Sequence, residues 1–199
     1  MATHDFSTSL NYEQSKFPKA DKFYTEKFKA TLITRIGFED EASKALQRMD
    51  IDVAITINGN KINVSEKDRK DDWGDLLVEF YSKYPTTKGW MDNTNADFMA
   101  YFVPNYVYWI NKKELTNFYN NILFPAVPDS FFSDIIRENP KRSARSAKEI
   151  IIGGIKEKIY VVSAYNSPRN SNAEWYTLNI CVTYKFLEKQ GVTIVKHPL

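Results

Sequence analysis

The chain has 199 residues, 43% hydrophobic and 15% aromatic, so it is long and apolar enough to bury a core and is not a disordered chain. Its formal net charge of +2 excludes a histone-like polycation but permits a local basic patch. A single cysteine, Cys181, excludes an internal disulfide, and two histidines near opposite ends, His4 and His197, argue against a zinc site and a Ser-His-Asp hydrolase. With no signal-peptide pattern and no run of about 20 apolar residues, we expect a soluble, cytoplasmic protein in a reducing compartment.

The first part of the chain predicts helices followed by a group of three strands. Residues 1–17 look loosely ordered. Asn58-Gly59 is the strongest hairpin signal in the sequence. The predicted elements are a helix over 18–36, a short helix in EDEASKALQRM, and strands over 52–57, 61–67 and 75–82.

The rest of the chain predicts further helices and strands. Asn111 and Glu114 form a capping-box-like pattern at the start of one helix. The predicted elements are helices over 95–102, 111–123 and PDSFFSDIIREN, a basic loop PKRSARSAKE, and strands over 106–110, 149–152, 158–164 and 175–184.

This order predicts an α/β fold with a mixed central sheet flanked by helices and a C-terminal β-rich extension. We expect a flexible segment at 1–17 and a core at 18–125. The extension at 126–199 belongs to the same domain or forms a small subdomain.

Polar and charged side chains occur on all three strands between residues 50 and 82. Ser65 and Lys67 share a face because side chains alternate along a strand. Asp52 begins the first strand, and the two arms of the hairpin have similar length, so Asp52 and Lys67 lie near the same open end. Glu79 lies within the apolar run LLVEFY, where an unpaired carboxylate is costly, so a partner such as Lys67, Arg69 or a metal is expected.

This group of side chains predicts a divalent metal site with a lysine beside it. Two carboxylates and several waters suit Mg²⁺ (or Mn²⁺), and we expect Asp52 and Glu79 to be the ligands. Asp50 competes with Asp52 for this role, but Asp52 gives the better match. A lysine beside the metal positions or deprotonates a water and offsets phosphate charge, as hydrolysis of a phosphodiester requires. The alternative to a metal site is that Asp52 and Lys67 have no functional role. Strand ends and runs of charged residues are commonly exposed to solvent, which is enough to explain charged side chains there.

The order helix-strand-strand-strand-helix-strand, with Asp52 opening the hairpin and Ser65-Glu66-Lys67 on its return strand, resembles the PD-(D/E)XK nuclease superfamily. This fold occurs in many restriction enzymes and Holliday-junction resolvases. The resemblance covers roughly residues 18–123, and the phrases GDLLVEFYS, GWM and ADFMAYF resemble members from phage and mobile elements.

The resemblance implies catalytic roles for particular residues. Asp52 and Lys67 match the family's aspartate and lysine, and Ser65 replaces its second carboxylate, as in some restriction enzymes with an S-x-K motif. Such enzymes recruit a glutamate further along, and Glu79 is the natural candidate, 79 − 67 = 12 residues after the lysine. Ser65 then supports the site through a hydrogen bond or a water.

The family often adds a glutamate from its first helix. Glu26 is the expected one here, with Glu39 and Glu41 less favoured. Gln47 resembles a position that helps to hold the site in some members.

Basic residues offer contacts to a nucleic acid backbone, because lysine and arginine give sequence-independent affinity for phosphates. A solvated, non-functional surface is the equal alternative for the basic loop. The candidates are Arg69, Lys83 and Lys88 near the proposed site and Lys141, Arg142 and Arg145 in PKRSARSAK.

The sequence therefore favours a metal-dependent nuclease, with DNA as its expected partner, no membrane, and a homodimer as an open alternative. A second hypothesis is a non-catalytic module of the same fold that binds nucleic acid or a partner protein; Ser65 favours it. A nucleotide enzyme ranks lower because Gly153-Gly154 lacks a phosphate-loop fingerprint.

Overall fold

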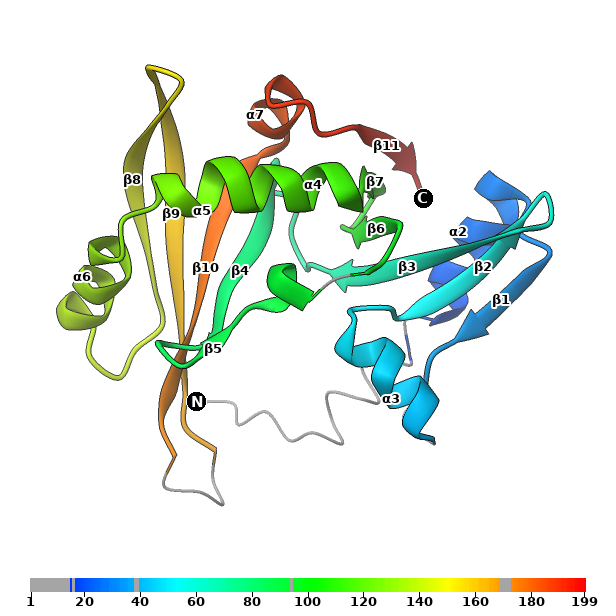
Figure 1. Ribbon diagram of the computed structural model, residues 1–199, viewed down its shortest axis with the longest axis horizontal. Helices are drawn as coiled ribbons and strands as arrows, with labels where there is room; N and C mark the ends of the chain where they lie inside the picture. The colour runs from blue at the N-terminus through cyan, green and yellow to red at the C-terminus, as the bar shows by residue number, and fades with distance from the viewer. Residues whose placement is uncertain (1–14, 16, 38–39, 94, 169–172) are drawn as a thin grey trace.

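The structure is a computed structural model that describes residues 15, 17–37, 40–93, 95–168 and 173–199, so almost all of the predicted flexible segment at 1–17 lies outside the described residues. The described chain contains both helices and strands, and several strands or helices follow one another directly (Figure 1). The helices are α2 (Phe17–Phe28), α3 (Glu41–Arg48), η1 (Trp90–Asn93), α4 (Lys112–Phe118), the π-helix η2 (Tyr119–Leu123), α5 (Phe124–Ala126), α6 (Ser130–Glu138) and α7 (Tyr184–Lys189). The strands are β1 (Leu32–Arg35), β2 (Val53–Ile57), β3 (Asn60–Asp68), β4 (Asp75–Lys83), β5 (Thr87–Lys88), β6 (Phe98–Phe102), β7 (Tyr106–Asn111), β8 (Ala144–Ile152), β9 (Ile155–Asn166), β10 (Trp175–Thr183) and β11 (Ile194–Pro198).

The α/β class is confirmed, and the strands form two sheets. One sheet is mixed and has the order β1-β2-β3-β6-β7-β11, in which β3 and β6 are parallel. The other is antiparallel and has the order β5-β4-β10-β9-β8. The two sheets lie side by side in the molecule, with helices packed around them (Figure 1).

The hairpin of β2 and β3 forms as the sequence predicts. Asn58 and Gly59 both have positive φ, 50° and 79°, as expected for the two-residue turn that joins twisted antiparallel strands. Val53 pairs with Val64 and Ile57 with Asn60, so the start of β2 lies beside the later part of β3. This register brings the residues around Asp52 to those around Ser65–Lys67.

The third predicted strand forms but does not join this hairpin. β4 pairs with β10 and β5, whereas the other neighbour of β3 is β6. Residues 69–74 carry the chain from one sheet to the other, and Arg69 forms an ion pair with Asp75 where β4 begins. The expectation of three adjacent strands at 52–57, 61–67 and 75–82 was therefore wrong.

Three other expectations about elements were also wrong. The helix predicted over 18–36 ends at Phe28, and residues 32–35 are β1. The segment predicted as a helix over 95–102 contains β6, a strand that is buried on both faces. Its residues are almost all apolar, so the alternation of polar and apolar residues that marks a half-exposed strand is absent from its sequence. The predicted basic loop includes the first six of the nine residues of β8.

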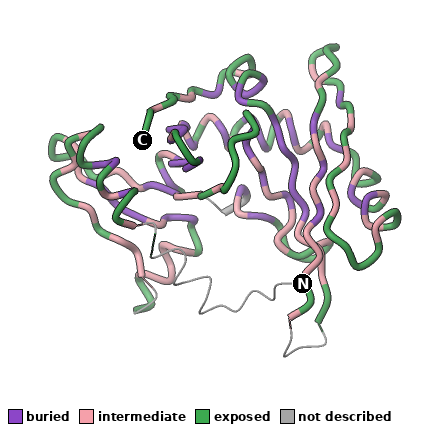
Figure 2. Tube along the Cα trace, turned by 180° about the vertical axis from the view of Figure 1, so that it is seen from behind, coloured by how far each residue is buried: buried purple, intermediate pink, exposed green. Residues whose placement is uncertain are grey.

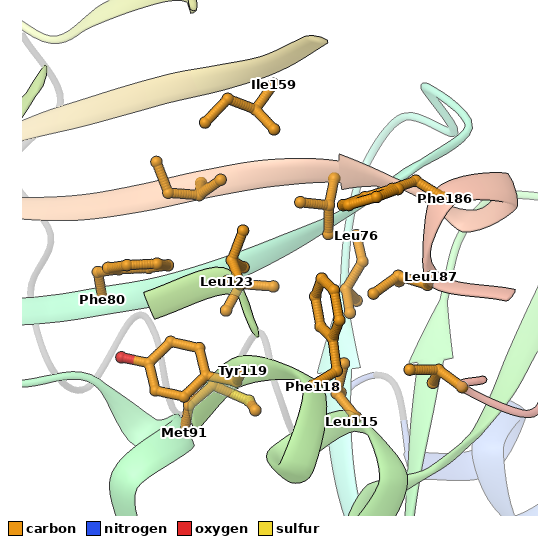
Figure 3. Packing of buried hydrophobic residues seen from close by; sticks show 14 of the residues in the cluster. Leu76, Phe80, Met91, Leu115, Phe118, Tyr119, Leu123, Ile159, Phe186 and Leu187 are labelled. Carbon is orange, nitrogen blue, oxygen red and sulfur yellow. The ribbon is translucent and has the colours of Figure 1, made fainter. Parts of the chain in front are cut away.

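The core has two parts, one on either side of the mixed sheet. The larger contains the inner faces of both sheets and the residues of α4 and η2 that lie across them; buried segments run through the centres of the strands (Figure 2). Leu115, Phe118 and Leu123 approach Leu76 and Phe80 of β4 in this region (Figure 3). The smaller part lies between α2 and the opposite face of the mixed sheet.

Among the described residues, no helix has the length and apolar character needed to cross a membrane. Cys181 is buried on β10, as its apolar surroundings predict.

Candidate active site

The candidate site lies on the face of β3 that carries Ser65 and Lys67. In the parallel pairing with β6, Ser65 lies opposite Met99 and Lys67 opposite Tyr101, two residues of the larger core. This face therefore points toward the larger core. Glu66 points to the opposite face of the mixed sheet.

Asp50 is the centre of the polar cluster on this face. It follows α3 in a left-handed conformation (φ 57°), with its backbone N–H bonded to the carbonyl of Gln47. Its Oδ1 accepts a hydrogen bond from the Lys67 ammonium at 2.6 Å, and its Oδ2 accepts one from Ser65 at 2.9 Å. The carboxylate is 8% exposed. Asp50 thus lies within hydrogen-bond distance of both Ser65 and Lys67.

Asp52 forms the more open part of the cluster. Its Oδ2 accepts a hydrogen bond from the backbone N–H of Glu66 at 2.7 Å, which ties the start of β2 to β3. The same oxygen lies 3.5 Å from the Lys67 Nζ, and the two side chains are 35% and 26% exposed. The predicted proximity of Asp52, Ser65 and Lys67 is therefore present, with Asp50 as the nearer carboxylate.

Lys112 completes the cluster and was missed by the sequence reasoning. It is the first residue of α4, directly after the capping residue Asn111, and its side chain is 1% exposed. Its Nζ lies 3.2 Å from Asp50 Oδ2 and 4.0 Å from the centroid of the Trp90 ring. No pattern in INKKEL distinguishes Lys112 from its exposed neighbour Lys113.

The two lysines respond differently to this environment. Burial lowers the pKa of Lys112 to about 7, since Asp50 compensates only part of the lost hydration and Lys67 repels the charge. Burial also acts to lower the pKa of Lys67, but Asp52 and Asp50 together raise it above its ordinary value. The pKa of Asp50 is held below its ordinary value because the two lysines outweigh the effect of its own burial. Lys67 and Asp50 are thus charged at neutral pH, whereas Lys112 is close to its midpoint.

A second polar cluster lies on the opposite face of β3. Glu66 accepts hydrogen bonds from the Tyr24 hydroxyl at 2.6 Å and from Arg35, which also pairs with Asp21. Burial raises the pKa of Glu66 despite these partners. The first helix therefore contributes Tyr24, and not Glu26, to the polar groups around β3.

The two predicted glutamates do not join the Asp52–Lys67 cluster. Glu26 is on the exposed face of α2 and pairs with Lys22 at 3.8 Å. Glu79 is on β4 in the other sheet, and its carboxylate accepts a hydrogen bond from Ser82. Its partner is thus Ser82 rather than the expected Lys67, Arg69 or metal, because β4 leaves the hairpin sheet.

The remaining candidates are placed as follows. Gln47 donates a hydrogen bond to the carbonyl of Ile36 at 2.8 Å, so it connects α3 to the residue that follows β1. Glu41 pairs with Lys44 on α3, and Glu39 lies outside the described residues.

The predicted nucleic-acid contacts do not form one patch. Arg69 and Arg145 both pair with Asp75, at the start of β4. Lys83 and Lys88 lie at the opposite end of β4 and on β5. Lys141 pairs with Glu174 at 3.0 Å, and Arg142 is exposed in the turn before β8.

A magnesium ion is commonly held by one or two carboxylates together with waters and substrate phosphates. The predicted pair does not fit, because Asp52 and Glu79 belong to separate clusters. Asp50 and Asp52 do fit, because both direct an oxygen to the same Lys67 ammonium and so converge on one positive charge. Across the described part of the chain, three or more acidic, histidine or cysteine side chains nowhere gather in a metal-binding group. Asp50 and Asp52 therefore offer a two-carboxylate site.

Comparisons of the chain with family models, with curated proteins and with solved structures find no match.

Proposed function

We propose that the protein is a metal-dependent nuclease that hydrolyses phosphodiester bonds, with DNA as the expected substrate. The observation that carries this proposal is the position of the Lys67 ammonium, 2.6 Å from Asp50 and 3.5 Å from Asp52, at a point where Lys67 and Asp52 remain partly exposed. An aspartate before one strand of a hairpin and an S-x-K triplet on the other support a restriction-endonuclease-like core.

Each residue of the cluster has a distinct proposed role. Asp50 and Asp52 would hold Mg²⁺ or Mn²⁺, which when bound lowers the pKa of a water and offsets charge on the phosphate. Lys67 donates hydrogen bonds to a water or a phosphate oxygen beside the carboxylates. Ser65 fixes the orientation of Asp50 through its 2.9 Å hydrogen bond.

Asp50 replaces Glu79 as the expected second metal ligand. Ser65 occupies the strand position of the missing carboxylate, and Asp50 Oδ2 lies within hydrogen-bond distance of it. The left-handed conformation of Asp50 directs its carboxylate there from a residue that precedes the strand. Glu79 and Glu26 have no role in this version of the site.

A second candidate function is a non-catalytic module that binds nucleic acid or a partner protein. It is favoured by one observation: both oxygens of Asp50 already contact Ser65, Lys67 and Lys112, so the carboxylate is neutralised without a metal. Such a closed set of ion pairs is also how a protein satisfies buried charges for structural reasons.

Two measurements distinguish these functions. Calorimetric titration with Mg²⁺ and Mn²⁺ is expected to show binding to the wild-type protein that Asp52→Asn weakens by more than tenfold. Incubation with DNA and either ion is expected to give cleavage that Lys67→Ala abolishes. Lys61→Ala is the matched control, because Lys61 is an exposed lysine at the far end of the same strand.

Metal-dependent cleavage that is equal in wild type and Lys67→Ala would refute the proposed site. DNA binding without any metal uptake or cleavage would favour the non-catalytic module.

A further inference from the structure

An exposed tryptophan lies on the segment that joins the two sheets. Trp73 is in the loop between β3 and β4, and 58% of it is exposed, whereas most large apolar side chains of the described chain are buried. Tryptophan is enriched at binding interfaces because its ring combines a large apolar face with a polar N–H.

Cationic side chains lie close to this ring and to the ring of a neighbouring tyrosine. The Arg145 guanidinium lies 4.3 Å from the Trp73 ring centroid and 4.1 Å from that of Tyr160, so it contacts both rings. Arg69 lies 5.9 Å from the Trp73 ring, and Lys158 lies 5.2 Å from the Tyr160 ring. We call these five residues the Trp73 surface.

Asp75 fixes the orientation of the two arginines. Its carboxylate is 5% exposed and pairs with both Arg69 and Arg145, which come from different sheets. The guanidinium planes are therefore preorganised beside the rings, and less side-chain entropy is lost when a ligand binds. In the loop itself, Asp72 accepts hydrogen bonds from the Gly74 backbone N–H and the Tyr108 hydroxyl.

The Trp73 surface lies next to the candidate active site along the chain of β3. The backbone N–H of Arg69 donates to the carbonyl of Phe102 at 2.9 Å, which extends the pairing of β3 with β6 by one residue. Ser65, Lys67 and Arg69 therefore follow the same alternation, and Arg69 lies about 7 Å beyond Lys67 along the strand. A nucleic acid strand that is bound at Lys67 and runs along β3 toward Arg69 would meet Trp73 next.

We infer that the Trp73 surface binds an unpaired segment of the nucleic acid strand, with a base stacked on Trp73 and adjacent phosphates at Arg69, Arg145 and Lys158. The inference rests on the proposed nuclease function and specifies its substrate as single-stranded, or as having a single-stranded part next to the cleaved bond. Aromatic rings interleaved with arginine and lysine are the means by which proteins hold single strands without reading their sequence.

The test measures binding apart from cleavage. Every variant is made in the Lys67→Ala background, and binding of a fluorescent 20-nucleotide single-stranded DNA is followed by anisotropy and by quenching of tryptophan fluorescence. We expect Trp73→Ala to weaken binding about tenfold, as the loss of one stacked base predicts, and to remove most of the quenching.

Trp175→Ala is the matched control. Trp175 is also partly exposed and lies near a lysine, 5.9 Å from Lys83, but it begins β10 and is about 20 Å along that strand from Cys181, the residue that pairs with Tyr160. We expect its variant to bind like the parent protein. Arg145→Lys keeps the charge but loses the planar contact with both rings, and we expect binding to weaken about threefold.

The possible outcomes separate the inference from the nuclease proposal. Weaker binding in Trp73→Ala than in Trp175→Ala supports the inference. Equal binding by the two variants, or a preference for a blunt duplex of the same length, overturns it, and cleavage by the protein with Lys67 intact would then leave the nuclease function standing. If the protein binds DNA through Trp73 but cleaves no DNA, the binding role of the Trp73 surface stands and the proposed nuclease function is refuted. Binding of an acidic peptide but of no oligonucleotide also overturns the inference.

Discussion

Replacement of Lys112 by methionine gives a direct test of how the buried cluster is charged. The Lys112 side chain is 1% exposed, and its Nζ contacts Asp50 at 3.2 Å and the Met91 sulfur at 3.8 Å. Methionine has a similar length and retains contact with the Trp90 ring, but it carries no charge. The variant therefore removes the titration of this one group with little change in volume.

The magnitude follows from the pKa. Burial lowers the pKa of Lys112 to about 7 in the folded protein, against about 10.4 in an unfolded chain. Between these values the unfolded chain binds more protons than the folded one, so the free energy of unfolding rises with pH. From pH 7 to pH 9.5 the gain from this group is about 3 kcal/mol.

Urea denaturation at pH 7 and pH 9.5, followed by circular dichroism, measures this gain. We expect this rise in the free energy of unfolding in the wild type and in the control variant Lys113→Met, because Lys113 is the exposed neighbour of Lys112. We do not expect it in Lys112→Met. The same change with pH in wild type and Lys112→Met would show that Lys112 is fully charged in the folded protein, and that its burial does not depress its pKa.

Three further substitutions test the contacts around the site. Gly89→Ala places a Cβ 2.1 Å from the backbone oxygen of Glu79. Overpacking typically costs about 1–3 kcal/mol, so we expect thermal denaturation to show a loss of stability of this size. An unchanged melting temperature would contradict the close approach. Asn111→Ala removes the side-chain cap of α4, and chemical denaturation should show a loss of about 1 kcal/mol of stability. Asn111→Asp keeps an oxygen that can cap the helix and should therefore lose little stability. Glu66→Ala leaves the buried Tyr24 hydroxyl without its acceptor and should cost about 3 kcal/mol in urea; a loss below about 1 kcal/mol would mean that the cluster behind β3 contributes little.

The hairpin and its polar residues were predictable because their signals are local. Asn58-Gly59 predicts the turn, and the turn fixes which residues of the two strands meet, so the proximity of Asp52 and Lys67 follows from the sequence alone. The cap at Asn111 was predicted for the same reason.

Which carboxylates lie beside Ser65 and Lys67 was not fully predictable, because their positions depend on backbone conformation and on segments distant in the sequence. Asp50 reaches Ser65 through a positive φ, which is uncommon for residues other than glycine, and nothing in MDIDVAI indicates it. Lys112 arrives from a helix 62 residues further along the chain. Glu79 was expected beside Lys67 because consecutive strands usually pair, but β4 pairs with β10, which the local pattern does not reveal.

The pairing of β4 with β10 has a consequence during synthesis. Residues 75–83 and 175–183 are neighbours in the finished sheet, with Val78 opposite Ile180 and Leu76 opposite Val182, yet about a hundred residues separate them in the chain. As the chain leaves the ribosome, β4 emerges several seconds before its partner, at ~5–20 residues per second, and exposes an unpaired apolar edge throughout that interval. Nascent chains halted before residue 175 should therefore be bound by chaperones or aggregate, whereas release beyond residue 183 lets the antiparallel sheet close.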